Sequence, residues 1–149
     1  MAYYDEHAAE FFRATAGEDF RAMYVPFVTE LPVRASILDA ACGSRRDTRA
    51  FLGMGFKVTA IDASSRMAAL ASRNCGHRCK VLEFGEMAFE EQFDGIWACA
   101  SLLHVPKAQI DEIMRRFVRA LKVGEGYVCF AERGERGGAG EGWSVFQFL

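Results

Sequence analysis

A regular alternation of two apolar patterns is the feature that most constrains the fold of this chain. Short, almost continuously apolar runs, such as ILDA at 37–40 and FDGIWACA at 93–100, predict strands that are buried on both faces. Between these runs, apolar residues recur every three to four positions, which is the spacing of an amphipathic helix. This alternation predicts a parallel sheet with helices on both faces.

The expected elements follow one another from residue 7 to residue 131. Helices are expected at 7–16, 18–31, 47–54 and 64–74, and from Pro106 onward. Strands are expected at 35–40, 56–62, 79–84, 93–100 and 127–131. Gly55 suits the end of one helix, and Ser64 or Ser65 suits the start of the next. Right-handed crossovers then give an α/β fold with a Rossmann-like, doubly wound and mostly parallel sheet.

Composition and charge narrow the class of protein. The chain has 149 residues, of which 51% are hydrophobic, enough for one domain with its own core. The net charge of -2 gives no general excess of positive charge for binding nucleic acid, and no apolar run approaches the roughly 20 residues of a membrane helix. The N-terminus, MAYYDEHAAEFF, is acidic where a signal peptide is basic. We expect a cytoplasmic protein with neither nucleic acid nor membrane as partner.

The cysteines are expected to be free thiols that pack as small apolar residues in a reducing compartment. They are Cys42, Cys75, Cys79, Cys99 and Cys129. The segment CGHRC at 75–79 could supply three zinc ligands, but no second Cys/His pair completes the set. We therefore expect a turn after a helix there, and no metal site.

Two carboxylates at strand ends indicate the class of ligand, because ligands of such sheets bind at the carboxyl ends of the strands. Asp39 ends the first strand, directly before the loop in DAACGSRRDT at 39–48. A carboxylate there disfavours a pyrophosphate and suits an ammonium or sulfonium group. Asp62 ends the second strand, where it can accept hydrogen bonds from ribose hydroxyls. S-adenosylmethionine, a positively charged adenosine without phosphates, fits both positions.

At this point the chain resembles the class I S-adenosylmethionine-dependent methyltransferases, especially small bacterial ones of the tellurite-resistance type. The segment ILDAACGSRRDTRAF is similar to the family loop D-x-G-x-G-x-G, and ALKVGEGYV is similar to the LKPGG turn before strand five. The segments at 58–67 and 93–106 match in order, so the likeness runs from Tyr3 to about Ala131. It implies methyl transfer to an acceptor. Because the net charge of -2 disfavours nucleic acid, we expect this acceptor to be a small molecule.

The resemblance also implies a cofactor-binding set. Asp39 would lie near the amino group of the cofactor, the backbone at Ala41 and Gly43 near its methionine moiety, and Asp62 at the ribose. The rest of the set is Ala63 and Met67 at the adenine; Phe84, Glu86 and Met87 at its far edge; Cys99, Ala100 and Ser101 beneath the sulfonium; and Tyr3 or Tyr4 over the pocket. Structural alternatives stay open, with Asp62 in a helix-capping turn, Met67 in the core and Glu86 as a solvated loop charge.

No residue is assigned a catalytic role. His104 could act as a general base at the rim, although capping or packing before the Pro106 helix is the alternative. Arg46 and Asp47 are expected to pair in the first turn of their helix, where the dipole favours Asp47. Transfer from a sulfonium mainly needs positioning, which agrees with the lack of an obvious triad.

Two loop positions depart from the family pattern. Ala41 replaces the first glycine, which costs one methyl group and some freedom at positive φ. Arg45 replaces the last glycine and costs of order 1 kcal/mol or more if its φ is positive. The Arg45 side chain could turn to solvent, pair with Asp39 in competition with the cofactor, or contact the cofactor carboxylate.

The end of the chain also departs from the family, whose members continue after strand five with a helix and an antiparallel strand pair. We expect one domain with an N-terminal helical cap at 1–32, a cofactor-binding core at 33–131 and a flexible glycine-rich tail at 132–149. A shortened member without the usual C-terminal strands would expose the edge of strand 127–131. The segment WSVFQFL could supply a substitute strand, or a homodimer could bury that edge.

Two rival functions stay open beside methyl transfer. A degenerate, shortened member would bind the cofactor weakly or not at all and act as a binding or interaction module, as Arg45 and the missing strands suggest. A nicotinamide-dependent oxidoreductase is disfavoured by Asp39 and by the lack of G-x-G-x-x-G.

Overall fold

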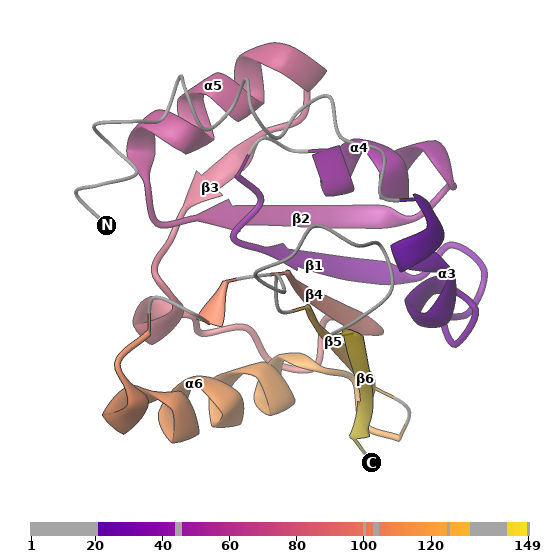
Figure 1. Cartoon of the computed structure of the whole chain (residues 1–149), viewed down its shortest axis with the longest axis vertical. Helices are drawn as coiled ribbons and strands as arrows, with labels where there is room; N and C mark the ends of the chain where they lie inside the picture. Colours follow the sequence, from indigo (N-terminus) through magenta and orange to yellow (C-terminus); the bar gives the residue numbers. More distant parts are fainter. Residues whose placement is uncertain are drawn as a thin grey trace.

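A mostly parallel sheet forms the centre of the molecule. The structure is a computed structural model that describes residues 21–43, 46–99, 101–102, 105–124, 126–131 and 143–148. Within these residues a six-stranded sheet has the order β3-β2-β1-β4-β5-β6 (Figure 1). The first five strands pair in parallel, and β6 pairs antiparallel with β5. The predicted fold class, a Rossmann-like doubly wound sheet, is confirmed.

The observed elements lie close to the predicted ones. The strands are β1 (Ser36–Ala40), β2 (Lys57–Asp62), β3 (Cys79–Val81), β4 (Gly95–Cys99), β5 (Gly126–Ala131) and β6 (Trp143–Phe148). The helices are α3 (Arg21–Val28), α4 (Arg46–Gly53), α5 (Ser65–Cys75) and α6 (Lys107–Ala120), with a short 3-10 helix η1 (Phe84–Glu86). The helix predicted at 7–16 lies outside the described residues.

Local sequence signals account for several of these boundaries. The Ser64 hydroxyl accepts a hydrogen bond from the Met67 N–H at 3.2 Å, and so caps the start of α5 as predicted. Gly76 ends the same helix in the left-handed region, at φ 65°. Within the segment CGHRC, residues 76–78 join the end of α5 to the start of β3, so the predicted turn after a helix is confirmed. Gly55, at φ 90°, follows α4 in the same way.

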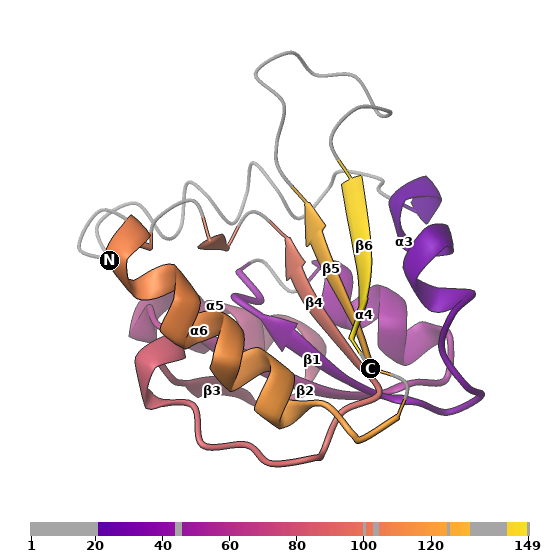
Figure 2. The ribbon, with the colours of Figure 1, turned by 90° about the horizontal axis from the view of Figure 1, so that it is seen from below.

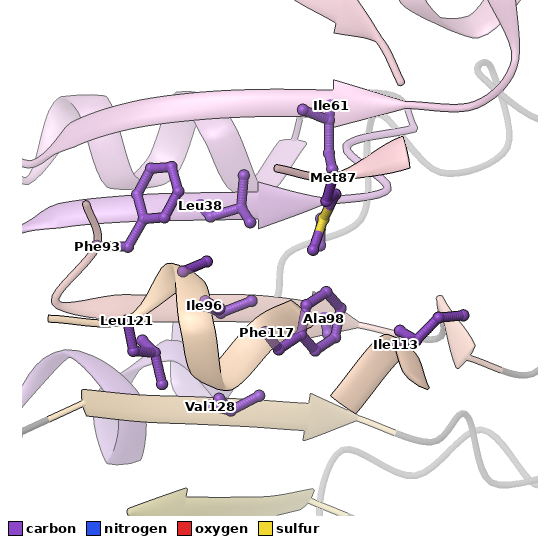
Figure 3. Packing of buried hydrophobic residues seen from close by; sticks show 12 residues of the cluster. Leu38, Ile61, Met87, Phe93, Ile96, Ala98, Ile113, Phe117, Leu121 and Val128 are labelled. Atoms are coloured by element: carbon purple, nitrogen blue, oxygen red, sulfur yellow. The ribbon is translucent and has the colours of Figure 1, made fainter. Parts of the chain in front are cut away.

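Helices cover both faces of the sheet, with α6 on one face and α3, α4 and α5 on the other (Figure 2). Figure 3 shows the core on the α6 side, whose labelled side chains lie between that helix and the strands. Its buried residues are Leu38, Ala40, Ile61, Met87, Phe93, Ile96, Ala98, Ile113, Phe117, Ala120, Leu121 and Val128. We call this set the α6-side core.

The opposite core is built mainly from aromatic side chains. Trp97 of β4 lies at its centre, with its ring centroid 5.3–5.4 Å from those of Tyr24, Phe27 and Phe51. These rings come from β4, α3 and α4, and all four side chains are fully buried. We call this set, together with Ile37 and Val58, the aromatic core. It seats α3 and α4 on the sheet.

The connection from β3 to β4 corrects one predicted boundary. The strand expected at 79–84 ends at Val81, and the chain then turns into η1. The Phe84 ring packs edge-on against Phe117, with centroids 5.5 Å apart. Burial of this ring against α6 outweighs continuation of an edge strand, so Phe84 lies in η1 rather than at a strand end.

The C-terminal segment corrects the predicted tail and the predicted exposed strand edge. β6 pairs with β5 along its whole length, from Gly126 opposite Phe148 to Ala131 opposite Trp143. The prediction of a flexible tail at 132–149 is therefore wrong for residues 143–148. The edge of β5 that we expected a homodimer to bury is instead paired with β6 of the same chain. The physical reason is that β6 satisfies the backbone groups that an unpaired β5 would expose. The alternative of a substitute strand is the one observed.

No helix in the described part of the chain is long and apolar enough to cross a membrane.

Gly95 provides a test of the packing between α3 and the sheet. A Cβ added there would lie 2.7 Å from the Phe27 ring and 2.9 Å from a Leu31 methyl carbon. Gly95→Ala should therefore lower the free energy of unfolding by about 1–3 kcal/mol, measured by urea denaturation. Gly53→Ala is the control, because a Cβ there meets no atom within 4 Å, and it should be neutral or slightly stabilising. Equal stability of Gly95→Ala and the wild type would contradict this packing.

Candidate functional site

The candidate site lies where the carboxyl ends of β1, β2 and β4 meet. β4 pairs with β1 although η1 and two other strands separate them along the chain. The winding of the sheet reverses between these two strands, and open α/β sheets bind their ligands at such a point. Asp39, Asp62 and Cys99 all lie at or next to the end of their strands, as predicted.

The loop between β1 and α4 has an unusual backbone. We use "β1–α4 loop" for its described part, residues 41–43. Ala41 has φ 67° and Gly43 has φ 50°, so both adopt the left-handed conformation. The expectation that alanine at position 41 meets a positive φ is confirmed, and an L-residue there costs about 1–2 kcal/mol. Within the loop, the Cys42 N–H donates to the Ile61 carbonyl at 2.9 Å.

Asp62 holds this loop from the end of β2. Its carboxylate accepts hydrogen bonds from the Gly43 N–H at 3.0 Å and from the Ser64 N–H at 2.8 Å. The side chain thus takes part in the turn before α5, the alternative weighed above, and also binds the β1–α4 loop.

Asp39 points into the protein from the end of β1. The residue is only 1% exposed, and its carboxylate accepts a hydrogen bond from the Thr48 hydroxyl at 2.5 Å. Thr48 belongs to α4 and is itself buried. Sequence reasoning did not identify this partner, because nothing local distinguishes a threonine that faces a strand end. The approach of Asp39 to a ligand amino group stays a prediction.

Asp47 forms a second buried carboxylate cluster at the start of α4. It accepts hydrogen bonds from the Tyr24 hydroxyl, from Arg46 Nε at 2.9 Å and from Trp97 Nε1 at 2.8 Å. The predicted pairing of Arg46 with Asp47 is confirmed. Burial and the Asp47 carboxylate raise the pKa of Tyr24 above its usual value, so this hydroxyl stays protonated.

The contacts of Asp47 with Tyr24 and Trp97 were missed at the level of sequence. The available signal was spacing, because Asp47 lies four residues before the fully buried Phe51 and therefore on the same face of α4. A carboxylate on the buried face of a helix needs donors inside the protein.

Cys42 and Cys79 lie side by side behind the β1–α4 loop. Their Sγ atoms are 2.6 Å apart, and both side chains are buried among the small residues Ala60, Ala68 and Ala71. The contact with Cys79 and burial raise the pKa of the Cys42 thiol above its usual value. Both are free thiols packed as small residues, as predicted.

The other predicted ligand contacts have varied surroundings. Met67, at 1% exposed, and Met87, at 2% exposed, are buried inside the protein, and Met87 belongs to the α6-side core. Ala63 is half-buried next to Asp62. Glu86 is exposed, and its carboxylate accepts a hydrogen bond from the Glu83 N–H at 3.2 Å. Their roles toward a ligand stay predictions. The predictions for Tyr3, Tyr4, Arg45, Ala100 and His104 lie outside the described residues.

Ser101 carries an unmatched polar atom near the end of β4. The residue is buried, and its Oγ has no hydrogen-bond partner among the described residues. Buried hydroxyls in folded proteins are nearly always hydrogen-bonded, so an unmatched one at this edge is a feature that a ligand could satisfy.

In the described ranges, no three His, Cys, Asp or Glu side chains form a group that could bind a metal ion. Within the CGHRC turn, the His77 ring nitrogen Nε2 lies 2.7 Å from the Val58 carbonyl oxygen.

Comparison with known families gives an independent assignment. Residues 37–124, which include the β1–α4 loop, α6 and both strand-end aspartates, match the family of methyltransferase domains. The chain belongs to the methyltransferase domain family. It is also 31% identical over 107 residues to YqeM of Bacillus subtilis, a candidate methyltransferase. That match covers 67% of this chain and 43% of YqeM, so this methyltransferase domain spans less than half of that relative.

Solved structures share the fold. The 1,6-didemethyltoxoflavin-N1-methyltransferase of Burkholderia thailandensis superposes with a TM-score of 0.71 at 24% identity, over 90% of this chain and 62% of the other. A TehB-like S-adenosylmethionine-dependent methyltransferase of Corynebacterium glutamicum superposes with a TM-score of 0.70 at 24% identity, over 97% of this chain and 78% of the other. The [4+2]-cyclase SpnF superposes with a TM-score of 0.64 at 23% identity, over 92% of this chain and 61% of the other. At this identity the likeness shows a common fold, and SpnF shows that one fold serves other chemistry.

Ala41→Gly tests the strain in the β1–α4 loop. Glycine adopts a φ of 67° without steric cost, although it loses more backbone entropy on folding. We expect the free energy of unfolding to rise by up to about 1 kcal/mol, which raises Tm by about 2–4 °C for a domain of this size. Ala40→Gly is the matched control in β1 and should lower Tm. A lower Tm for Ala41→Gly as well would rule out strain at this position.

The Cys42 thiol gives a prediction on pH dependence. Because its pKa is raised in the folded state, its contribution to stability is present below the unfolded value of about 8.5 and is lost as the pH rises above it. The free energy of unfolding of the wild type should therefore fall between about pH 8 and pH 10 by more than that of Cys42→Ala. Urea denaturation at several pH values measures this difference. If the free energy of unfolding falls equally in the two proteins, the prediction is wrong.

Proposed function

We propose that this chain transfers a methyl group from S-adenosylmethionine to a small-molecule acceptor. The observation that carries the proposal is the tie between the left-handed β1–α4 loop and Asp62, through the Gly43 N–H at 3.0 Å. This tie places main-chain groups and a carboxylate beside each other at the end of adjacent strands. Membership of the methyltransferase domain family supports the same reading, and the Burkholderia relative was solved with S-adenosylhomocysteine bound.

The residues at the strand ends fit this cofactor. Asp62 lies at the end of β2, where its carboxylate would accept hydrogen bonds from ribose hydroxyls. Ala41 and Gly43 are half-buried, and their main chain would face the methionine moiety. Ser101 supplies a buried hydroxyl that lacks a partner among the described residues. Ala63 and Cys99 are both half-buried, which leaves part of their surface for the adenine and for the sulfonium side.

The chain's part in such a reaction is binding and orientation. When bound, S-adenosylmethionine supplies a methyl group already activated by the sulfonium. Asp62 and the β1–α4 loop would fix the direction of the transferable group, and orientation alone can be worth about 7–11 kcal/mol of the barrier. The acceptor is proposed to be a small molecule because the net charge of -2 offers no general attraction for nucleic acid.

Isothermal titration calorimetry with S-adenosylmethionine, S-adenosylhomocysteine and NAD tests the cofactor. Binding of the first two but not of NAD is expected. Asp62→Ala should weaken the binding of S-adenosylhomocysteine by about 10–100-fold, because it removes hydrogen bonds to a charged acceptor. Glu112→Ala, on the exposed side of α6, is the control and should bind as the wild type does.

Two results would contradict the proposal. Binding of neither adenosyl compound by the wild type would favour a non-catalytic member of the family, and tight binding of NAD would favour an oxidoreductase. Transfer of a labelled methyl group from S-adenosylmethionine to fractionated small metabolites then identifies the acceptor.

A further inference from the structure

The Asp47 cluster joins three elements around one buried carboxylate. Tyr24 comes from α3, Trp97 from β4 and Arg46 from α4 itself, and each donates a hydrogen bond to Asp47. Removing a carboxylate from water is costly, and several donors are needed to offset that cost. The cluster therefore has one preferred arrangement, in which the first turn of α4 sits against β4 and α3.

The next residue of α4 makes the same kind of contact with the neighbouring strand. Thr48 donates to Asp39 of β1 at 2.5 Å, while Asp47 accepts from Trp97 of β4 at 2.8 Å. Asp39 and Trp97 are register partners in the β1–β4 pair, so their side chains project from the same face of the sheet. Two successive residues thus attach the first turn of α4 to both strands that flank the point where the winding reverses.

The β1–α4 loop lies between these attachments. It begins at the end of β1 and leads into the first turn of α4, and it contains Ala41 in a left-handed conformation. A strained backbone persists only where the surrounding structure holds it in place. Two contacts made by the loop itself are those of the Cys42 and Gly43 amides, which donate to Ile61 and Asp62. Asp39, near the end of β1, is itself bonded to Thr48 of α4, so the start of α4 is tied to the strand end from which the loop departs.

We propose that Asp47 is a positioning residue for the β1–α4 loop, and that Tyr24 of α3 and Trp97 of β4 act through it. Asp47 itself is buried among donors from the protein, and it acts by holding the loop that would bind the cofactor. The inference on ligand affinity rests on the proposed function, whereas the inference on loop order does not depend on it.

Two measurements test this inference in the full chain. The first is the affinity for S-adenosylhomocysteine by calorimetry, and the second is the hydrogen-exchange rate of the Cys42 and Gly43 amides by NMR. For Asp47→Ala we expect about 10–100-fold weaker binding and faster exchange of both amides, because a charged acceptor of several hydrogen bonds is lost. Asp47→Asn keeps one carbonyl acceptor and should recover part of both properties.

Tyr24→Phe isolates one donor and covers the case in which Asp47→Ala does not fold. It removes the hydroxyl and keeps the ring packed against Phe51 and Trp97. We expect about 3–10-fold weaker binding, the effect of one hydrogen bond to a charged group. Phe117→Leu is the control matched for stability, because Phe117 lies in the α6-side core, on the other face of the sheet. It should lower Tm without changing ligand affinity or exchange of the two amides.

The outcomes separate this inference from the proposed function. If the wild type binds S-adenosylhomocysteine and the Asp47 and Tyr24 variants bind it equally well with unchanged amide exchange, the positioning role is wrong. It is also wrong if Phe117→Leu reproduces both changes at the same loss of Tm. If the wild type binds no adenosyl compound, the proposed function fails, and faster or unchanged exchange of the Cys42 and Gly43 amides still decides the positioning role.

Discussion

The parallel pairing of β1 with β4 is the interaction on which the rest of the structure depends. It joins two segments more than fifty residues apart, with Asp39 opposite Trp97 and Ile37 opposite Gly95. Because α4 follows β1 and α6 follows β4, this pair sends α4 and α6 to opposite faces of the sheet (Figure 2). The same pair creates the reversal of winding at which the strand-end carboxylates gather. Without it, neither core would close.

Buried carboxylates organise the edge of the sheet that would receive a ligand. Asp39, Asp47 and Asp62 are all buried, and each accepts hydrogen bonds from a different set of partners. Asp39 accepts from α4, Asp47 from α3, α4 and β4, and Asp62 from the β1–α4 loop and the turn before α5. Buried charge is tolerated only where donors surround it, so these aspartates restrict how the strand ends, the β1–α4 loop and α4 can be arranged. In this methyltransferase domain the polar network and the aromatic core meet at Trp97, whose ring packs in the core while its Nε1 donates to Asp47.

Most of the fold could be predicted, because its signals are local. The apolar runs and helical spacings between residues 35 and 131 identified the elements, and Ser64 and Gly55 identified two of their boundaries correctly. The errors arose where distant contacts decide. Phe84 left the predicted strand to pack on Phe117, and the segment Trp143–Phe148 paired with β5 instead of staying loose. For the site, Asp39 and Asp62 were located by their strand ends, whereas Thr48 and the Tyr24 and Trp97 contacts of Asp47 were not found.

The sequence by itself determined the order of strands and helices, the strand ends that carry Asp39 and Asp62, and the need for an alanine to accept a positive φ at position 41. These properties depend on periodicity, capping and backbone sterics, which act over a few residues. Only the tertiary structure decided that Asp47 is buried among donors from α3 and β4, that Met67 and Met87 are enclosed in the protein, and that β6 covers β5. Those outcomes depend on which surfaces meet across the sheet, and no short stretch of sequence contains that information.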